Sequence, residues 1–356
     1  MKYFLAILFL TAILEASPSC FQAPTIPSQC GYNAPAGINV GTVGDNDFFL
    51  TGSFIYWQPL QDNMNIGLMK KSTSSATQVK STFIEMQYDF QPGFKIAAGM
   101  NLQKDDWDGY VEYTWLHGSQ KTTATDSSLN PTIYATWGQT SNGLSTGALP
   151  FESVSGRYST HLDFVDLDIG RSCYVGQSLS VRPGMGVRGA WITQTMNVQY
   201  TNPNLALAST TYEDNVYAHS RSWGVGLRGS LALNWLMGQE WRLFSFSEAD
   251  LLYTRYNISD KTVYTNTAPG PSAQITTHDK VNSVRTHLDF EMGFGWGRYF
   301  NCNKQHVDLS ASYGFQVFFD QNMFRHYNDD TLLAYNNNPN GNLYIQGLTT
   351  TLRFDF

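Results

Sequence analysis

The segment from Trp223 to Trp235 alternates between one face of large apolar residues and Gly229 and another face of small or polar residues. Strict alternation over this length predicts a β-strand with one apolar face. At about 3.3 Å per residue and a tilt of about 40 to 45°, the two tryptophans lie roughly 28 Å apart along a membrane normal. That spacing is typical of a transmembrane β-strand with an aromatic side chain at each lipid headgroup level.

Composition favours the same class of structure. Charged residues make up 14% of the 356 residues, against about 25% in an average soluble domain. After residue 14 the chain has no apolar run that approaches the roughly 17 to 25 residues of a transmembrane helix. A membrane protein of this composition is therefore expected to be a β-barrel, since only helices and closed barrels satisfy their backbone groups in lipid.

The N-terminus resembles an export signal, because Lys2 precedes an apolar run from Tyr3 to Leu14. We predict a signal peptide over residues 1–19, a periplasmic N-terminal segment over 20–46 and an outer-membrane barrel over 47–356. The formal net charge of -7 argues against a nucleic-acid partner.

Alternation and turn residues predict about ten spanning strands and an all-β, transmembrane, antiparallel up-and-down barrel. Long polar segments follow the odd strands and short turns follow the even strands, which predicts that both termini are periplasmic. A further hairpin around Pro131 to Trp137 is the alternative, and it would give twelve or more strands. The ten predicted strands are 47–57, 81–100, 107–117, 157–171, 178–192, 222–235, 241–256, 285–300, 306–319 and 343–356.

The last strand alternates up to the terminal Phe356. Such a strand resembles the signal read by the barrel-assembly machinery of the outer membrane, which we expect as a partner together with outer-membrane lipid. The aromatic residues that we assign to the membrane girdle are Trp223, Trp235, Trp296, Tyr344, Phe354 and Phe356.

Ionisable side chains on the polar faces of these strands are predicted to line the lumen. They could line a water-filled path, or they could pair across a narrow interior and plug it. These residues are Lys95, Asp108, Glu112, Arg182, Arg188, Arg228, Arg285, His287, Asp289, Glu291, His306, Asp308, Arg353 and Asp355.

A short motif occurs twice, as Thr160 to Phe164 and as Thr286 to Phe290. Each copy puts a His and an Asp on one strand face, which a surface protease could use for general base catalysis. A change of alternation after Phe164 suggests a β-bulge in one copy.

Several segments resemble the Legionella-type and chlamydia-related major outer-membrane protein family. The similar segments are Phe48 to Gln58, Pro92 to Ile96, Trp107 to Trp115, Arg182 to Ile192 and Gln346 to Phe356. The resemblance implies a pore-forming bacterial outer-membrane barrel that passes small solutes, and it supplies no catalytic residue.

The four cysteines are all predicted to lie on the oxidising, periplasmic side. Cys20 and Cys30 are the easiest pair to join, because a short segment links them. Cys173 and Cys302 are predicted to lie too far apart for a bridge, and so to stay free or to form links between molecules. Such links would resemble the cross-linked envelopes of chlamydia-like bacteria and would give a homo-oligomer or disulfide-linked envelope partners.

The sequence thus predicts a porin-like channel in the bacterial outer membrane for small hydrophilic solutes or ions, with no catalytic role, cofactor or metal. The first alternative is a plugged barrel that acts as a structural or adhesin-like, surface-binding protein through long extracellular loops. The second is an outer-membrane protease that uses the His and Asp pairs.

Overall fold

We analysed a computed structural model of the chain. It describes residues 47–72, 79–102, 107–126, 132–137, 151–175, 178–202, 212–238, 240–266, 273–301, 305–330, 333–337 and 341–356. The predicted signal peptide and N-terminal segment lie outside the described residues. In the described part of the chain, no helix is long and apolar enough to cross a membrane.

Ten strands form a closed antiparallel barrel, which confirms the predicted fold class. Neighbours around the barrel are also neighbours in sequence, and β1 pairs with β16 to complete the circle. The strands are β1 (Asp47–Gln61), β4 (Gln91–Leu102), β5 (Trp107–Thr125), β7 (Ser153–Arg171), β9 (Leu179–Asn202), β10 (Tyr212–Leu236), β11 (Trp241–Asn266), β12 (Ala273–Phe300), β13 (Gln305–Phe318) and β16 (Leu343–Asp355).

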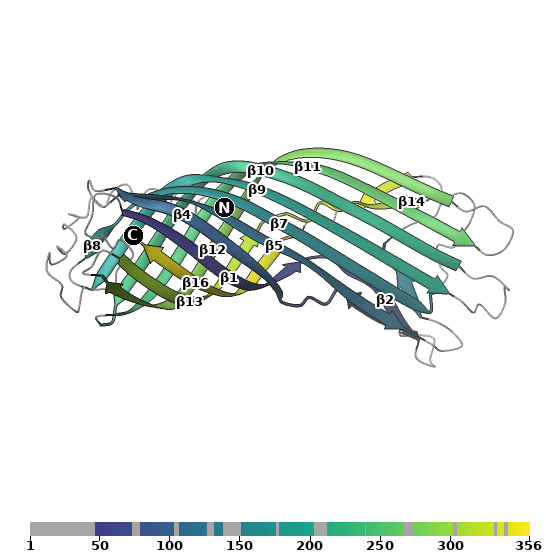
Figure 1. Ribbon diagram of the computed structural model, residues 1–356. Coiled ribbons are helices and arrows are strands. Elements are labelled where there is room, and N and C mark those ends of the chain that lie inside the picture. The colour runs from purple at the N-terminus through teal and green to yellow at the C-terminus, as the bar shows by residue number, and fades with distance from the viewer. Residues whose placement is uncertain are drawn as a thin grey trace.

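The barrel has a tall side and a short side. Strands β9 to β12 are 24 to 28 residues long, whereas β1, β4, β13 and β16 have 12 to 15 residues. The long strands continue past the end of the short ones as a curved wall, at the end opposite the C-terminal end of β16 (Figure 1). We call this wall the extension.

Two details of the predicted strands are wrong. Residues 81–90 do not continue into β4, because β3 (Val79–Glu85) pairs with β2 (Asn65–Ser72) in a separate small sheet. The segment around Pro131 to Trp137 adds no barrel strand, since β6 (Ile133–Ala135) joins that same small sheet. The short strands β8 (Cys173–Val175), β14 (His326–Asp330) and β15 (Leu333–Asn337) also stand outside the ten.

The predicted bulge near Phe164 is also wrong. Strand β7 keeps one continuous register with β5 and with β9 through this region. Leu162 and Phe164 point into the barrel and are buried. The change of alternation arises because these two apolar side chains pack inside the barrel, while the apolar residues that follow them face outward.

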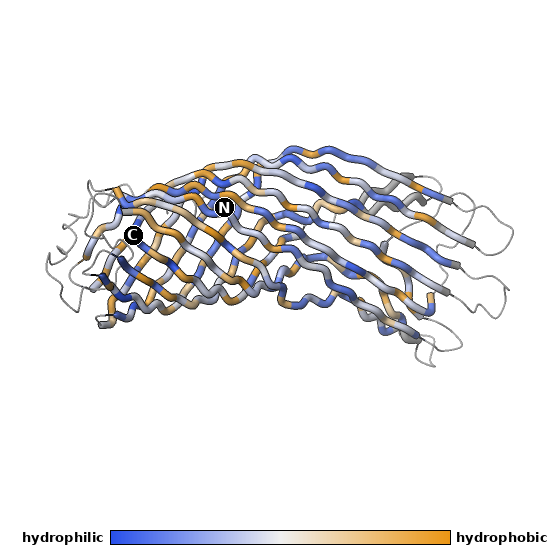
Figure 2. Tube along the Cα trace, in the orientation of Figure 1, coloured by the Kyte–Doolittle hydropathy of each residue, from blue (hydrophilic) through white to orange (hydrophobic). Residues whose placement is uncertain are grey.

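Hydrophobic residues gather in the part of the barrel around the C-terminal end of β16, and the extension is more hydrophilic (Figure 2). Many of the large ones are exposed there and form an apolar band on the outer face. Trp223 and Trp235 bound this band on β10 and are 43% and 55% exposed. The other predicted girdle residues also lie on the outer face: Trp296, Tyr344, Phe354 and Phe356.

A charge in the apolar band should be costly. Leu227 lies between the two tryptophans and is 73% exposed, so it faces lipid. We expect Leu227→Arg to lower the free energy of unfolding by about 2 to 4 kcal/mol. A folding titration in lipid vesicles measures this, with Tyr217→Arg on the extension of the same strand as the control. Equal losses for the two variants would contradict the assigned membrane level.

Candidate functional site

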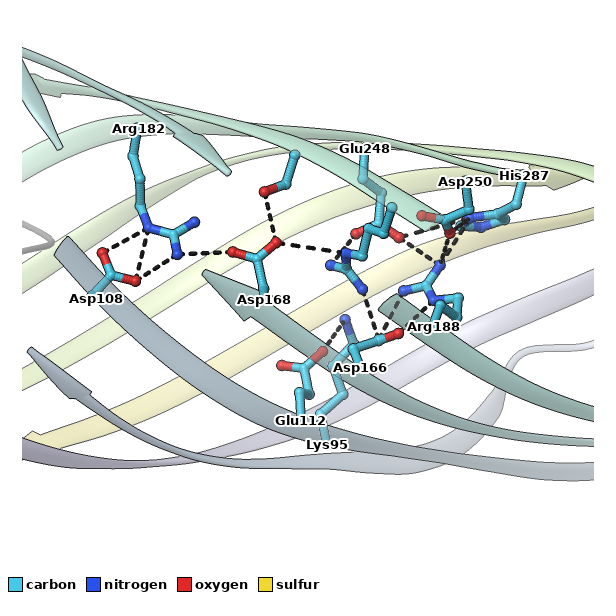
Figure 3. A network of polar contacts seen from close by, with 12 residues as sticks. Lys95, Asp108, Glu112, Asp166, Asp168, Arg182, Arg188, Glu248, Asp250 and His287 are labelled. Carbon is cyan, nitrogen blue, oxygen red and sulfur yellow. Dashed lines mark hydrogen bonds and ion pairs between the residues drawn. The ribbon is translucent and has the colours of Figure 1, made fainter. Parts of the chain in front are cut away.

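The half of the barrel interior that lies away from the extension holds a continuous set of ion pairs, which we call the charged network. Its members are Asp108, Asp166, Asp168, Arg182, Arg188, Arg228, Glu248, Asp250 and His287, and all are buried. They come from β5, β7, β9, β10, β11 and β12, so the network joins the inner faces of six strands (Figure 3). Charges enclosed in this way are stable only when each finds a partner.

Arg182 forms one end of the charged network. Its Nε donates to both carboxylate oxygens of Asp108 at 2.9 and 2.8 Å, and its Nη2 donates to Asp168 at 2.8 Å. A Cβ atom at Gly170 would collide with the guanidinium. The glycine therefore leaves the space that Arg182 occupies.

Arg188 forms the other end. Its Nε and Nη2 donate to Asp166 at 2.6 and 2.8 Å. Its Nη1 lies 2.5 Å from Glu248 and 2.7 Å from Asp250. Arg228 pairs with Asp166 and Glu248, and its Nε lies 3.9 Å from Asp168, the partner of Arg182, so Arg228 links the two ends. A single guanidinium at Arg188 thus contacts three carboxylates.

Three residues of the network have the spacing of metal ligands. One ligand atom each of Glu248, Asp250 and His287 lies within 4.8 Å of the other two. Arg188 Nη1 lies within 2.8 Å of those same side chains, at Glu248 Oε1, Asp250 Oδ2 and His287 Nδ1. The guanidinium therefore fills the position that a metal ion would take.

The structure places the predicted lumen residues on the inner face. Further pairs join Lys95 to Glu112 at 3.5 Å, and Asp355 to His306 at 3.0 Å and to Arg353 at 2.6 Å. Asp308 binds Arg242. Arg285 lies 3.5 Å from Asp320, closer to the extension than the charged network. Asp289 lies opposite Glu248 on the neighbouring strand, and Glu291 accepts a hydrogen bond from Ser312. Passage of solute along these residues stays a prediction.

The sequence reasoning missed six buried interior charges: Asp166, Asp168, Asp214, Arg242, Glu248 and Asp250. On β11 the polarity pattern is inverted in part, since Phe244 and Phe246 face inward while Ser245 and Ser247 face outward. The two phenylalanine rings lie beneath Arg242 and Arg228, at 5.6 and 5.9 Å. Arg242, Glu248 and Asp250 are separated by even numbers of residues on β11, so they lie on one face of the strand. This spacing could have identified these three residues from the sequence.

The two predicted His and Asp pairs do not form one site. His161 is exposed on the outer face, where its ring stacks on His117 at 4.2 Å. His287 is fully buried inside. The absence of a catalytic role stays a prediction.

An apolar layer lies next to the charged network, on the side that faces the extension. Side chains from seven strands meet in this cluster, and the rings of Phe164 on β7 and Phe318 on β13 stack at 5.4 Å. Phe318 also contacts the ring of His287 at 4.0 Å. The layer consists of Ile55, Trp57, Leu116, Leu162, Phe164, Ala190, Ile192, Leu252, Phe318, Leu343 and Ile345.

A cavity of about 230 Å³ remains among the charged side chains, on the side of the apolar layer that faces away from the extension. Its lining includes Lys95, Glu112, Arg228, Glu248 and Arg353. Further out, a second apolar cluster fills the inner side of the extension, where Ile66 of β2 and Ile133 of β6 pack against Val198 and Val216. The small sheet thus covers the inner face of the extension.

The chain matches one family of known proteins over most of its length. The family model is described as the Legionella pneumophila major outer membrane protein precursor, and it matches residues 44–356. The chain belongs to this family. As a member of the Legionella major outer membrane protein family, it is a bacterial outer-membrane β-barrel protein, which confirms the predicted family and localisation. No curated protein matches the chain.

Solved outer-membrane barrels are similar to this member of the family at low identity. The outer membrane protease OmpT from Escherichia coli is 10% identical, with a TM-score of 0.43 over 89% of this chain and 98% of that chain. The toluene transporter TodX from P. putida is 10% identical, with a TM-score of 0.25 over 88% and 90%. Outer membrane protein AlkL is 13% identical, with a TM-score of 0.26 over 78% and 94%.

The prediction that Cys173 could stay free is wrong. Cys173 is buried at the start of β8 and is disulfide-bonded. The sequence argument tested only its distance from Cys302, although four cysteines allow three pairings. Cys20, Cys30 and Cys302 lie outside the described residues.

Two carboxylates, Asp214 and Asp260, lie on the inner side of the extension, and neither forms an ion pair within the described residues. Burial and the nearby Asp260 raise the pKa of Asp214 to about 7. Burial also raises the pKa of Asp260 to about 7. Asp214 lies opposite Tyr200 of β9, and one of its carboxylate oxygens is buried without a hydrogen-bond partner.

These two pKa values predict that the extension loses stability as the pH rises. Below about pH 4 both carboxyls are neutral in the folded and unfolded states, so they cost nothing. Between about pH 4 and 7 the unfolded state releases its protons first, and the penalty is complete above pH 7. Asp214→Asn should therefore stabilise the extension by up to about 4 kcal/mol at pH 8 and have little effect at pH 4.

Hydrogen exchange of the β10 amides at both pH values measures this difference. Glu213→Gln is the control, since Glu213 is the neighbouring residue on the outward face. A gain at pH 4 that equals the gain at pH 8 would contradict the assignment.

Proposed function

We propose that this outer-membrane barrel is closed at rest and acts as a structural and surface-binding protein through its extension. The observation that carries the proposal is the apolar layer, in which side chains from seven strands meet inside the barrel. The charged network below it supports the same conclusion, because its arginines pair across the interior. Small hydrophilic solutes would have to displace both.

The proposal includes an orientation in which the short turns and both termini face the periplasm and the extension faces outward. Short periplasmic turns and longer extracellular segments are usual in outer-membrane barrels. The terminal strand that ends at Phe356 is proposed to be the segment that the assembly machinery reads.

Conductance in planar bilayers tests the closed state. Folded wild-type protein should give no stable opening events. Regular openings at low voltage would contradict the closed state and would favour a porin.

Labelling with a membrane-impermeant maleimide tests the orientation separately. Thr123→Cys, near the far end of β5, should be labelled on intact cells. Met237→Cys, which lies 49% exposed in the turn after β10, should be labelled only after permeabilisation. The reverse pattern would invert the proposed topology.

A porin-like channel remains the second candidate, and the cavity favours it. Within the described residues, ten carboxylates and six Lys or Arg side chains lie in the barrel interior on the side of the apolar layer that faces away from the extension. A path opened through the layer would therefore favour cations over anions. A preference for anions in any conducting state would contradict this candidate's charge assignment.

A further inference from the structure

The outer wall of the extension carries a group of exposed cations on the tall side of the barrel. They lie on five different strands and all point away from the interior. We call them the basic wall: Lys121, Arg157, Arg221, Arg255, Lys261 and Lys280.

Strand register brings these cations close together. Lys121 of β5 lies directly opposite Arg157 of β7. Arg221 of β10 and Lys280 of β12 are the two partners of Asn257 on β11, and Arg255 lies two residues along that strand. Like charges this close repel one another, so the wall has a cost unless an anion covers it.

The chain itself supplies little neutralisation. No ion pair within the described residues involves any member of the basic wall. The outward acids at this level are Asp163 and Glu213. Asp163 is already engaged, since Tyr113 Oη donates to it at 2.7 Å and His117 Nε2 lies 3.0 Å away. The wall is basic although the chain as a whole has a net charge of -7.

Aromatic side chains mark the level of the wall relative to lipid. Trp191 and Trp223 are 50% and 43% exposed at the upper edge of the apolar band, and Tyr253 is 48% exposed beside them. Arg221 lies two residues beyond Trp223, and Arg255 lies two residues beyond Tyr253. Because Trp and Tyr sit at the headgroup level, the cations begin where lipid phosphates lie.

We propose that the basic wall binds the phosphate groups of anionic lipids in the adjacent leaflet. Charge complementarity and continuity with the lipid-facing band both favour a lipid over a soluble anion. Arginine forks suit phosphate oxygens. The inference goes beyond the proposed function, and the binding itself does not depend on the orientation proposed above.

Binding of fluorescent bis-phosphorylated lipid A to the folded protein in octyl glucoside micelles tests the proposal. The variant replaces three cations, as Arg221→Ser, Arg255→Ser and Lys280→Ser. A membrane-surface Lys or Arg contributes about 1 kcal/mol, so the variant should bind about 100-fold more weakly. Raising the salt concentration should weaken wild-type binding in the same direction.

A charge-matched control removes three cations elsewhere, as Lys70→Ser, Lys80→Ser and Arg298→Ser, and should keep wild-type affinity. Heat-modifiable migration on gels checks that each variant is folded. A second variant with Arg221→Lys and Arg255→Lys keeps the charge and should retain most of the binding.

Three results would overturn the proposal. The first is equal affinity of the triple variant and its control. The second is equally tight wild-type binding of dephosphorylated lipid A. The third is full displacement of lipid A by millimolar inorganic phosphate, which would mean that the wall takes free phosphate and not a lipid.

Discussion

Arg188→Gln should lower the free energy of unfolding by about 3 to 5 kcal/mol, since it leaves buried carboxylates without their cation. The change removes the guanidinium that contacts Asp166, Glu248 and Asp250 together. A urea titration of the protein folded in phospholipid vesicles measures the loss.

A second substitution separates lost charge balance from lost packing. Asp250→Asn in the Arg188→Gln background should recover part of the stability, because one unpaired charge disappears. Arg298→Gln is the control, since Arg298 is 52% exposed and lies 3.6 Å from Glu240; such a pair contributes about 1 kcal/mol or less. Equal losses for Arg188→Gln and Arg298→Gln would refute the role given to the charged network.

If the closed state proposed above is correct, Phe164→Ala combined with Phe318→Ala should give conductance that the wild-type protein lacks. The two rings stack across the interior within the apolar layer, and their removal leaves a gap above the cavity. Each truncation should also cost about 3 to 5 kcal/mol of stability. Single-channel recording of the refolded double variant measures the opening.

The matched control truncates two phenylalanines that face lipid. Phe290 and Phe294 are 47% and 56% exposed on β12, so their double Ala variant should remain silent. A folded Phe164/Phe318 variant without conductance would show that the barrier to solutes lies elsewhere.

The ten barrel strands could be predicted from sequence because lipid imposes one simple rule on their outer faces. Each strand must present apolar residues to lipid at every second position. On β10 this rule holds without a break from Trp223 to Trp235. On β16 it holds at Leu348, Leu352, Phe354 and Phe356 but not at Gln346 and Thr350, and the predicted start at Leu343 agrees with the structure.

The interior could be predicted only in part, because it obeys no such rule. Inner positions hold charges where ion pairs form and apolar rings where the barrel is packed. Leu162 and Phe164 therefore looked like outward residues until their packing was known. The pairing of Arg188 with four side chains depends on how strands distant in sequence approach one another. Residue spacing along a single strand does not predict these contacts.

The small sheet escaped prediction for a related reason. Val79 to Glu85 has the composition of a strand, and alternation cannot say which sheet a strand joins. Its partner is β2 and not a barrel neighbour. A residue such as Ile66 is buried by contacts with the extension, which depend on the tertiary fold.

The seam between β1 and β16 has a consequence for the order of assembly. All other neighbouring barrel strands follow one another along the chain, whereas the seam pairs residues 49–61 with 343–355. Phe48 and the last residue, Phe356, exchange both backbone hydrogen bonds. Contacts so distant in sequence form slowly, because a very long loop must close first. Until the final residues arrive, the chain is an open sheet with two unpaired edges, and such edges are where strands of other molecules can add.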